Sequence, residues 1–279
     1  MTTRPEPNTV GAFFDVDHTL LAVNSAVLWV RHQRRIGKMS AAKALRSLTW
    51  VVRYRLSLLD LEAMTTKAVR DYAGVPVAEV EADTRAWFEA EIVRWICPEG
   101  QARVARHRRD GHVVALLSSG TRFSVEPLAE RLGVEHVLCT RLEEQDGVLT
   151  GKHVAPACAG PGKVVLAERF AAEHDIDLSR SYFYSDSFSD LPMLERVGRP
   201  QVVSPDPRLL RRARARLADR ALASGVIAAK GRARDAGRAG GDSAASMRAR
   251  SAAGRTRRQA REGTAVAAGR AVWHPPGHA

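Results

Sequence analysis

The feature that most constrains this chain is a short apolar segment that runs directly into two acidic residues. Residues 10–14, Val-Gly-Ala-Phe-Phe, have the length and composition of one buried strand. Asp15 and Asp17 follow one residue apart, so an extended backbone places both carboxylates on the same face. Two neighbouring carboxylates repel each other unless a cation or a proton lies between them. The segment predicts a cation-binding strand end or, alternatively, an ordinary turn rich in Asp and Thr.

Three later segments also place polar or charged side chains where a strand ends or a helix begins. They are Ser118-Ser119-Gly120-Thr121 after the apolar run 112–117, Lys163 after the breaker Gly160-Pro161-Gly162, and Asp186 with Asp190 after the run 181–184. A small polar loop that follows a strand suits a phosphate group at a helix N-terminus. Together the four segments favour a phosphate and cation site over an ordinary turn.

In this order, the four segments resemble the motifs of the haloacid dehalogenase (HAD) superfamily of phosphohydrolases. The first motif is Asp15-Val16-Asp17-His18-Thr19-Leu20, and the second is Leu116-Leu117-Ser118. The third is Lys163, and the fourth runs from Asp186 to Asp190. The resemblance covers about residues 10–215. One such motif is weak evidence, but four in the family's order are strong evidence.

The resemblance implies catalytic roles for the matched residues. Asp15 is expected to be the nucleophile, and Asp17 is expected to protonate the leaving group and then deprotonate water. Ser118 and Ser119 are expected to bind the phosphoryl oxygens. Lys163 is expected to bridge Asp15 and the phosphate. The implied enzyme is a phosphatase that passes through an aspartyl phosphate, which replaces one difficult step with two easier ones.

The resemblance also implies Mg²⁺ as cofactor, which is a hard ion that prefers oxygen ligands. The expected metal-binding residues are Asp15, Asp17 through its backbone carbonyl, Asp186 and Asp190, the last orienting either the metal's ligands or Lys163.

Each residue by itself has a simpler interpretation. Asp186 and Asp190 are also suited to cap a helix that begins near Leu191. Ser118 is suited to satisfy a strand end, and a single lysine such as Lys163 is usually solvated. Arg122, next to the serine loop, either faces the substrate or only starts a helix.

The pattern of elements predicts an α/β fold, with a HAD-like Rossmannoid parallel sheet and an inserted helical cap. Residues 10–21 and 98–218 are expected to form the α/β core, with strands at 112–117, 134–139, 148–150, 181–185 and 201–204. Residues 22–97 carry helical periodicity and read as a cap of four helices, similar to that of the phosphoserine phosphatase branch. Asp146-Gly147 predicts a hairpin turn. Residues 1–9 are expected to be a flexible lead-in.

The net charge of +12 is located almost entirely in the last quarter of the chain. From residue 208 to the end there are 17 Lys and Arg against 4 acidic residues, which leaves 26 against 27 in the rest. Residues 219–279 are rich in Arg, Ala and Gly and are expected to be disordered. The tail is interpreted as an arm for nucleic acid or an anionic surface, as the product of a shifted reading frame, or as solubilising disorder. A nucleic-acid-associated protein is therefore the alternative function.

Cysteine content and hydropathy suggest a cytoplasmic protein. The chain has three cysteines, which cannot all pair and which lack the spacing of a zinc site. The apolar stretches are interrupted by polar residues, so no transmembrane segment is expected.

The substrate is expected to be a small phosphorylated metabolite. Phosphoserine phosphatases carry a Glu shortly after the first motif, whereas this chain has Val23 and Asn24 there. This difference weighs against phosphoserine itself and leaves histidinol phosphate and phosphorylated amino alcohols as further candidates.

Overall fold

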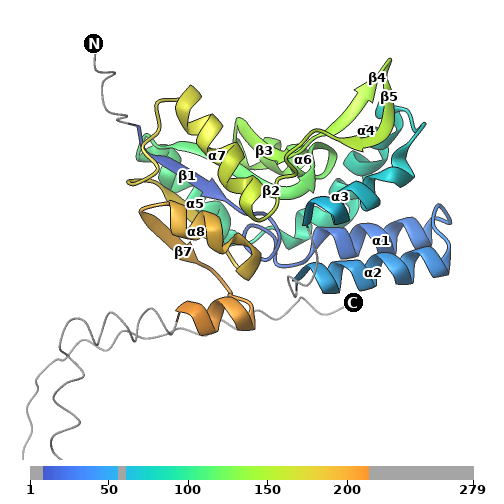
Figure 1. The fold of residues 1–279 in the computed structure, drawn as a ribbon, viewed down its shortest axis with the longest axis horizontal. Coiled ribbons are helices and arrows are strands. Elements are labelled where there is room, and N and C mark those ends of the chain that lie inside the picture. The colour runs from blue at the N-terminus through green and yellow to red at the C-terminus, as the bar shows by residue number, and fades with distance from the viewer. Residues whose placement is uncertain (1–8, 56–60, 214–279) are drawn as a thin grey trace, which may run out of the picture. The chain divides into compact units, whose positions relative to one another are not determined.

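The core of the molecule is a five-stranded parallel sheet, which confirms the predicted α/β fold (Figure 1). The computed structural model describes residues 9–55 and 61–213. The strand order is β3-β2-β1-β6-β7, with bounds Gly11–Phe14 (β1), Val113–Thr121 (β2), His136–Thr140 (β3), Tyr182–Ser185 (β6) and Arg199–Val202 (β7). Parallel neighbours need crossover connections, and helices supply them here.

Helices cover both faces of this sheet. Alternate strand residues point to opposite sides, so each face presents side chains that pack against helices. Phe14 packs with α5 (Pro98–Arg109) and α6 (Arg122–Leu132) in one buried cluster. Phe13 packs with α7 (Pro161–Glu173) and α8 (Leu191–Arg196) in another. Burial on both faces explains why the β1 segment is apolar at every position rather than at every second one.

A helical insertion, from Ser25 at the start of α1 to Trp95, separates β1 from the rest of the core. It contains α1 (Ser25–Arg35), α2 (Ala41–Arg55), α3 (Leu61–Val69), a 3₁₀ turn (Arg70–Tyr72) and α4 (Val77–Trp87). A π turn (Phe88–Ile92) and a second 3₁₀ turn (Val93–Trp95) continue α4. Asn24 caps α1, since its side-chain oxygen accepts the Val27 N–H at 3.0 Å.

A β-hairpin joins the helical insertion to the core (Figure 1). Strands β4 (Leu142–Gln145) and β5 (Val148–His153) pair antiparallel around Asp146-Gly147, both of which have positive φ, as the sequence predicted. The segment before α4 adds to the hairpin through a bridge between Pro76 and Val148. The hairpin residues Leu142 and Leu149 pack in a buried cluster with Val69, Val80 and Phe123.

Several predicted strand bounds differ from the observed ones. The strand predicted at 112–117 spans Val113–Thr121, the one at 148–150 extends to His153, and the one at 181–185 begins at Tyr182. The last strand spans Arg199–Val202 instead of 201–204, because its register is set by β6, where Tyr182 pairs with Arg199. The strand predicted at 134–139 begins two residues later, at His136, where pairing with Ala115 starts. The predicted basic tail, residues 219–279, and the flexible lead-in before Thr9 lie outside the described residues.

Candidate active site

The carboxyl ends of three strands meet at one edge of the sheet. Phe14 pairs with Leu116 on one side and with Tyr184 on the other. Asp15, Ser118 and Asp186 follow these residues by one or two positions, and all three are buried. Ligands of such sheets bind at this edge. The register therefore groups the first, second and fourth sequence motifs, as their position after strands predicted.

Lys163 lies at the centre of the buried charges at this edge. Its Nζ donates hydrogen bonds to Asp15 Oδ1 and to Asp190 Oδ2, each at 2.7 Å. The Lys163 residue is only 1% exposed, so it is not the solvated helix residue that a single lysine usually is. It stands in the first turn of α7, which begins at Pro161. Lys163 thus joins the first and fourth motifs through two direct ion pairs.

The environment of Asp15 favours its neutral form more than water does. Burial raises its pKa to about 7, although the neighbouring Lys163 charge works in the opposite direction. The nearby carboxylates of Asp190 and Asp17 raise the pKa further. An additional cation at this edge would favour the ionised form that a nucleophile needs.

Asp190 holds the lysine rather than capping a helix. It occupies the N-cap position of α8 but makes no capping hydrogen bond with its side chain. Instead its Oδ2 accepts from Lys163 and also from Ser185 Oγ, the latter at 2.7 Å. Ser185 Oγ in turn accepts the Ser187 N–H. No sequence pattern indicated this role of Ser185, because a serine in a buried strand carries no signal that marks a partner 5 residues away.

Asp17 connects the strand end to the helical insertion. Its Oδ1 accepts the backbone N–H of Ser25, the first residue of α1, at 3.0 Å. The intervening turn passes through His18, which has a positive φ of 55°. The acid predicted to donate and accept protons is therefore positioned by the first helix of the insertion.

Asp186 is held by the chain that follows β7. Its backbone carbonyl accepts the Asp206 N–H at 2.8 Å, and the Asp206 carboxylate accepts the Phe188 N–H at 2.7 Å. Asp206 also accepts from Arg208 N and Leu209 N. The Asp-Pro pair at a helix start is a recognisable capping signal, but the link from Asp206 to the fourth motif depends on the fold.

Comparison with known families decides what this arrangement is. Residues 12–195 match the sequence pattern of the haloacid dehalogenase-like hydrolases. The chain belongs to this family. All the predicted catalytic and metal residues of this HAD hydrolase, from Asp15 to Asp190, fall within the matched segment.

Curated relatives of this HAD hydrolase include several phosphatases. A probable phosphatase of Mycobacterium tuberculosis is 33% identical over 217 residues, which cover 77% of this chain and 75% of the relative. A phosphoserine phosphatase of the same organism is 31% identical over 212 residues, with 75% and 69% covered. A histidinol-phosphatase of Neisseria meningitidis is 28% identical, with 73% and 94% covered. The HAD hydrolase is accordingly a phosphatase.

Solved structures support the same fold. A Bordetella pertussis protein of unknown function superposes with a TM-score of 0.68 at 31% identity, covering 75% of this chain and 96% of that one. A phosphoserine phosphatase solved as a phospho-aspartyl intermediate analogue superposes with a TM-score of 0.56 at 21% identity, covering 73% and 90%. These relatives give no support to a nucleic-acid role for the tail.

The donor set of the HAD site suits magnesium. Among the residues that the structure describes, no three His, Cys, Asp or Glu side chains form a group able to hold a metal ion. The carboxylates of Asp17 and Asp190 each accept a hydrogen bond from another residue. Asp15, whose Oδ1 accepts a hydrogen bond from Lys163, and Asp186 are buried carboxylates, and Mg²⁺ is commonly bound by one or two carboxylates with water and phosphate oxygens. The predicted four-residue metal set stays a prediction.

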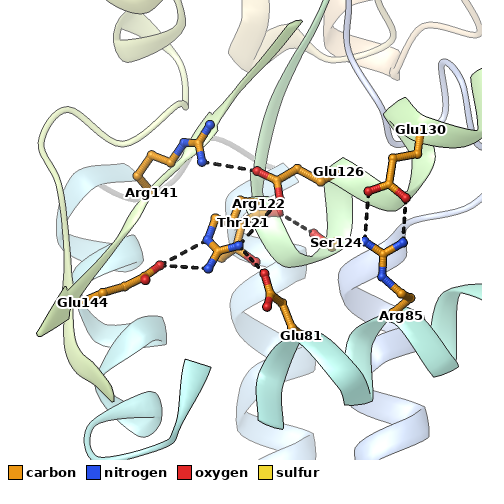
Figure 2. Close-up of polar contacts among 9 residues, drawn as sticks. All are labelled: Glu81, Arg85, Thr121, Arg122, Ser124, Glu126, Glu130, Arg141 and Glu144. Carbon is orange, nitrogen blue, oxygen red and sulfur yellow. Dashed lines mark hydrogen bonds and ion pairs between the residues drawn. The ribbon is translucent and has the colours of Figure 1, made fainter. Parts of the chain in front are cut away.

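Arg122 starts α6, and its guanidinium is surrounded by carboxylates (Figure 2). It contacts Glu81 of α4 at 2.6 Å, Glu144 of β4 at 3.0 Å and Glu126 at 3.6 Å. Of its two predicted interpretations, the structure supports the helix start, and the side chain links the insertion to the core.

In the described part of the chain, no helix is long and apolar enough to cross a membrane.

Proposed function

We propose that this chain is a Mg²⁺-dependent phosphomonoesterase that acts on a small phosphorylated metabolite through an aspartyl phosphate. The observation that carries the proposal is the position of Lys163 Nζ, 2.7 Å from both Asp15 and Asp190. A buried lysine that contacts the nucleophile places a fixed positive charge next to an incoming phosphoryl group. Phosphoryl transfer depends mainly on such positioning and charge stabilisation.

In the first half of the reaction, a carboxylate oxygen of Asp15 attacks phosphorus and the bond to the leaving oxygen breaks. The Lys163 contact fixes Asp15 Oδ1, which orients the carboxylate for an in-line approach. Asp17 donates a proton to the leaving alkoxide, so an alcohol departs. Ser118 and Ser119, which lie near the end of β2 and precede α6, supply hydrogen bonds to the phosphoryl oxygens.

In the second half, water attacks the phosphorus of the aspartyl phosphate. Asp17, now ionised, takes the proton from that water, and inorganic phosphate leaves as the Asp15 carboxylate is restored. The same residue thus serves as acid and then as base. The Ser25 N–H holds its carboxylate through both halves.

Magnesium, when bound, would neutralise charge on the phosphoryl oxygens and on the attacking carboxylate. Asp15 and Asp186 would hold it with their carboxylates, and Asp17 with its backbone carbonyl. We propose that Asp190 affects the metal site indirectly, through its contact with Lys163.

The substrate class follows from the relatives and from one local difference. Phosphoserine, histidinol phosphate and phosphorylated amino alcohols are the candidates, and two relatives carry the first two activities in their names. Asn24 stands where an acid would read a substrate ammonium group, and its side chain caps α1. This difference weighs against phosphoserine, and histidinol phosphate and amino alcohol phosphates stay candidates without a choice between them.

A phosphate-release screen tests the proposal. The panel holds phosphorylated amino acids, amino alcohols, histidinol phosphate and sugars, each assayed with Mg²⁺ and with a chelator. We expect turnover that requires Mg²⁺ and returns when Mg²⁺ is added in excess. Equal turnover with the chelator would contradict the metal requirement.

The nucleophile is tested with Asp15→Asn, and Asp175→Asn serves as a control. Asp175 is exposed and has a positive φ that Asn tolerates, so its substitution leaves the fold intact. We expect Asp15→Asn to abolish hydrolysis of para-nitrophenyl phosphate and to remove the covalent phosphate seen by mass spectrometry after acid quench. Full activity of Asp15→Asn would overturn the mechanism.

A further inference from the structure

Thr140 is a buried hydroxyl residue that no sequence motif marks. It is the last residue of β3 and is 1% exposed. Its Oγ1 donates a hydrogen bond to the backbone carbonyl of Ser119 at 3.1 Å. The same oxygen accepts the backbone N–H of Cys158, also at 3.1 Å. One hydroxyl therefore connects two segments that are far apart in the sequence.

The first of these segments is the serine loop, residues 118–121, where the sheet is irregular. Ser118 pairs with Cys139, but the next pair joins Thr121 to Thr140, so the register shifts between Ser118 and Thr121. A strand that leaves regular pairing has backbone groups without ladder partners, and such groups bond to a side chain or to water instead. Thr140 supplies it by donating to the Ser119 carbonyl. The Thr140 side chain thus sets the path of the loop that carries Ser118 and Ser119.

The second segment leads into the helix that carries Lys163. From Cys158 the chain passes through tight turns, in which Gly162 N–H donates to the Ala159 carbonyl and Lys163 N–H donates to the Gly160 carbonyl. The turn is crowded, since any side chain at Gly162 would overlap the carbonyl oxygen of Ala157. A bond that fixes Cys158 therefore fixes where α7 begins and where Lys163 stands.

We propose that Thr140 is a positioning residue for the phosphatase reaction, which sets the serine loop and the Lys163 helix in register with each other. The inference rests on the proposed function, in which Ser118, Ser119 and Lys163 act on the same phosphoryl group. Thr140 itself touches none of the reacting atoms. Its hydroxyl uses both its donor and its acceptor capacity, so a side chain with only one of them cannot replace it.

The test uses Thr140→Val and Thr140→Ser. Val has the shape of Thr without a hydroxyl, whereas Ser keeps the hydroxyl and loses only the methyl group. We expect Thr140→Val to lower kcat for para-nitrophenyl phosphate by about tenfold to a hundredfold, as misplaced catalytic groups do. We expect Thr140→Ser to restore kcat close to the wild-type value. Wild-type kinetics in Thr140→Val, or a Ser variant as impaired as the Val variant, would overturn the proposal.

Hydrogen exchange provides the readout that a merely structural role would not give. We expect Thr140→Val to speed amide exchange in residues 119–121 and 158–163 together, and Thr140→Ser to leave both segments protected. Exchange that rises evenly through all the strands of the sheet would contradict a positioning role. If the Val side chain prevents folding, Thr140→Ala removes the hydroxyl without added bulk and is judged by the same two measurements.

Thr150→Val is the matched control. The Thr150 hydroxyl also joins two segments, since it donates to the Glu143 carboxylate at 2.6 Å across the β4–β5 hairpin, but neither segment carries a catalytic group. We expect its kinetics to equal those of the wild type. Failure of the proposed function is seen separately, as activity retained by Asp15→Asn. Failure of this inference alone is seen as an inactive Asp15→Asn with an unimpaired Thr140→Val.

Discussion

Arg122 and Glu81 form an ion pair of 2.6 Å that joins the helix after the serine loop to the helical insertion (Figure 2). The Arg122 side chain is 16% exposed and also contacts Glu144 and Glu126. One cation thereby holds three carboxylates that come from α4, β4 and α6. A second link between α4 and α6, from Arg85 to Glu130, is exposed to solvent.

Removing the Arg122 charge should weaken the attachment of the insertion. Arg122→Met leaves Glu81, Glu144 and Glu126 with an excess of negative charge in a half-buried place, so we expect a loss of about 1–2 kcal/mol in the free energy of unfolding. Arg85→Met is the control and should change stability little, because exposed pairs contribute little. Urea unfolding of both variants measures the difference. Equal effects of the two variants would contradict the importance of the half-buried Arg122 contacts.

Asp190 and Ser185 should affect catalysis to different extents. Asp190→Asn removes one of the two negative charges that hold Lys163, and we expect kcat to fall about tenfold to a hundredfold. Ser185→Ala removes only a hydrogen bond to Asp190, so the expected fall is smaller. Steady-state kinetics on para-nitrophenyl phosphate rank the two variants. A Ser185→Ala variant that is more impaired than Asp190→Asn would contradict the view that Ser185 acts only through its hydrogen bond to Asp190.

Substitution of either of two crowded glycines should destabilise the protein, but only one should alter the enzyme's turnover. A side chain at Gly162 would overlap the Ala157 carbonyl, and one at Gly198 would overlap the Ser179 carbonyl. We expect Gly162→Ala and Gly198→Ala each to lose about 1–3 kcal/mol of stability, as overpacked sites do. Gly162 lies next to Lys163, so only its substitution should lower kcat per folded molecule. Thermal unfolding and active-site titration separate the two effects.

Stability should fall with acidification because of a buried histidine. Burial lowers the pKa of His107 from its ordinary 6.5 to about 4, and the nearby His112 adds to the effect. His107 bonds to His112 and to the Tyr184 hydroxyl, at 2.7 Å and 2.9 Å. Since the unfolded chain binds the proton more readily, stability is fully present above pH 6.5 and is lost as the pH falls toward 4.

The expected loss over this window is at most about 3–4 kcal/mol, from about 1.4 kcal/mol for each pKa unit. His107→Gln keeps a polar side chain that does not titrate and should flatten the pH dependence of the urea midpoint between pH 6.5 and 4. An unchanged slope in that variant would assign the acid sensitivity to other groups.

Much of the site's arrangement could be predicted from the sequence, because strand ends and turns are specified by runs of only a few residues. An apolar run followed by Asp15-Val16-Asp17 specifies a strand end, and Asp146-Gly147 specifies a hairpin turn. Since parallel strands present their carboxyl ends at one edge, the order of motifs was enough to group Asp15, Ser118 and Asp186. The same reasoning could not rank capping against ion pairing for Asp190, because both use the same side chain.

The sequence by itself thus determined the chemical groups of this protein, the strands that carry them and the sheet edge where they meet. The tertiary structure decided the partners. Lys163 meets Asp15 across 148 residues, and Arg122 meets Glu81 across 41 residues. Thr140 joins Ser119 to Cys158, across 21 and 18 residues. Such contacts depend on strand register and on which groups are buried together, and neither is encoded within a single turn of helix or one strand.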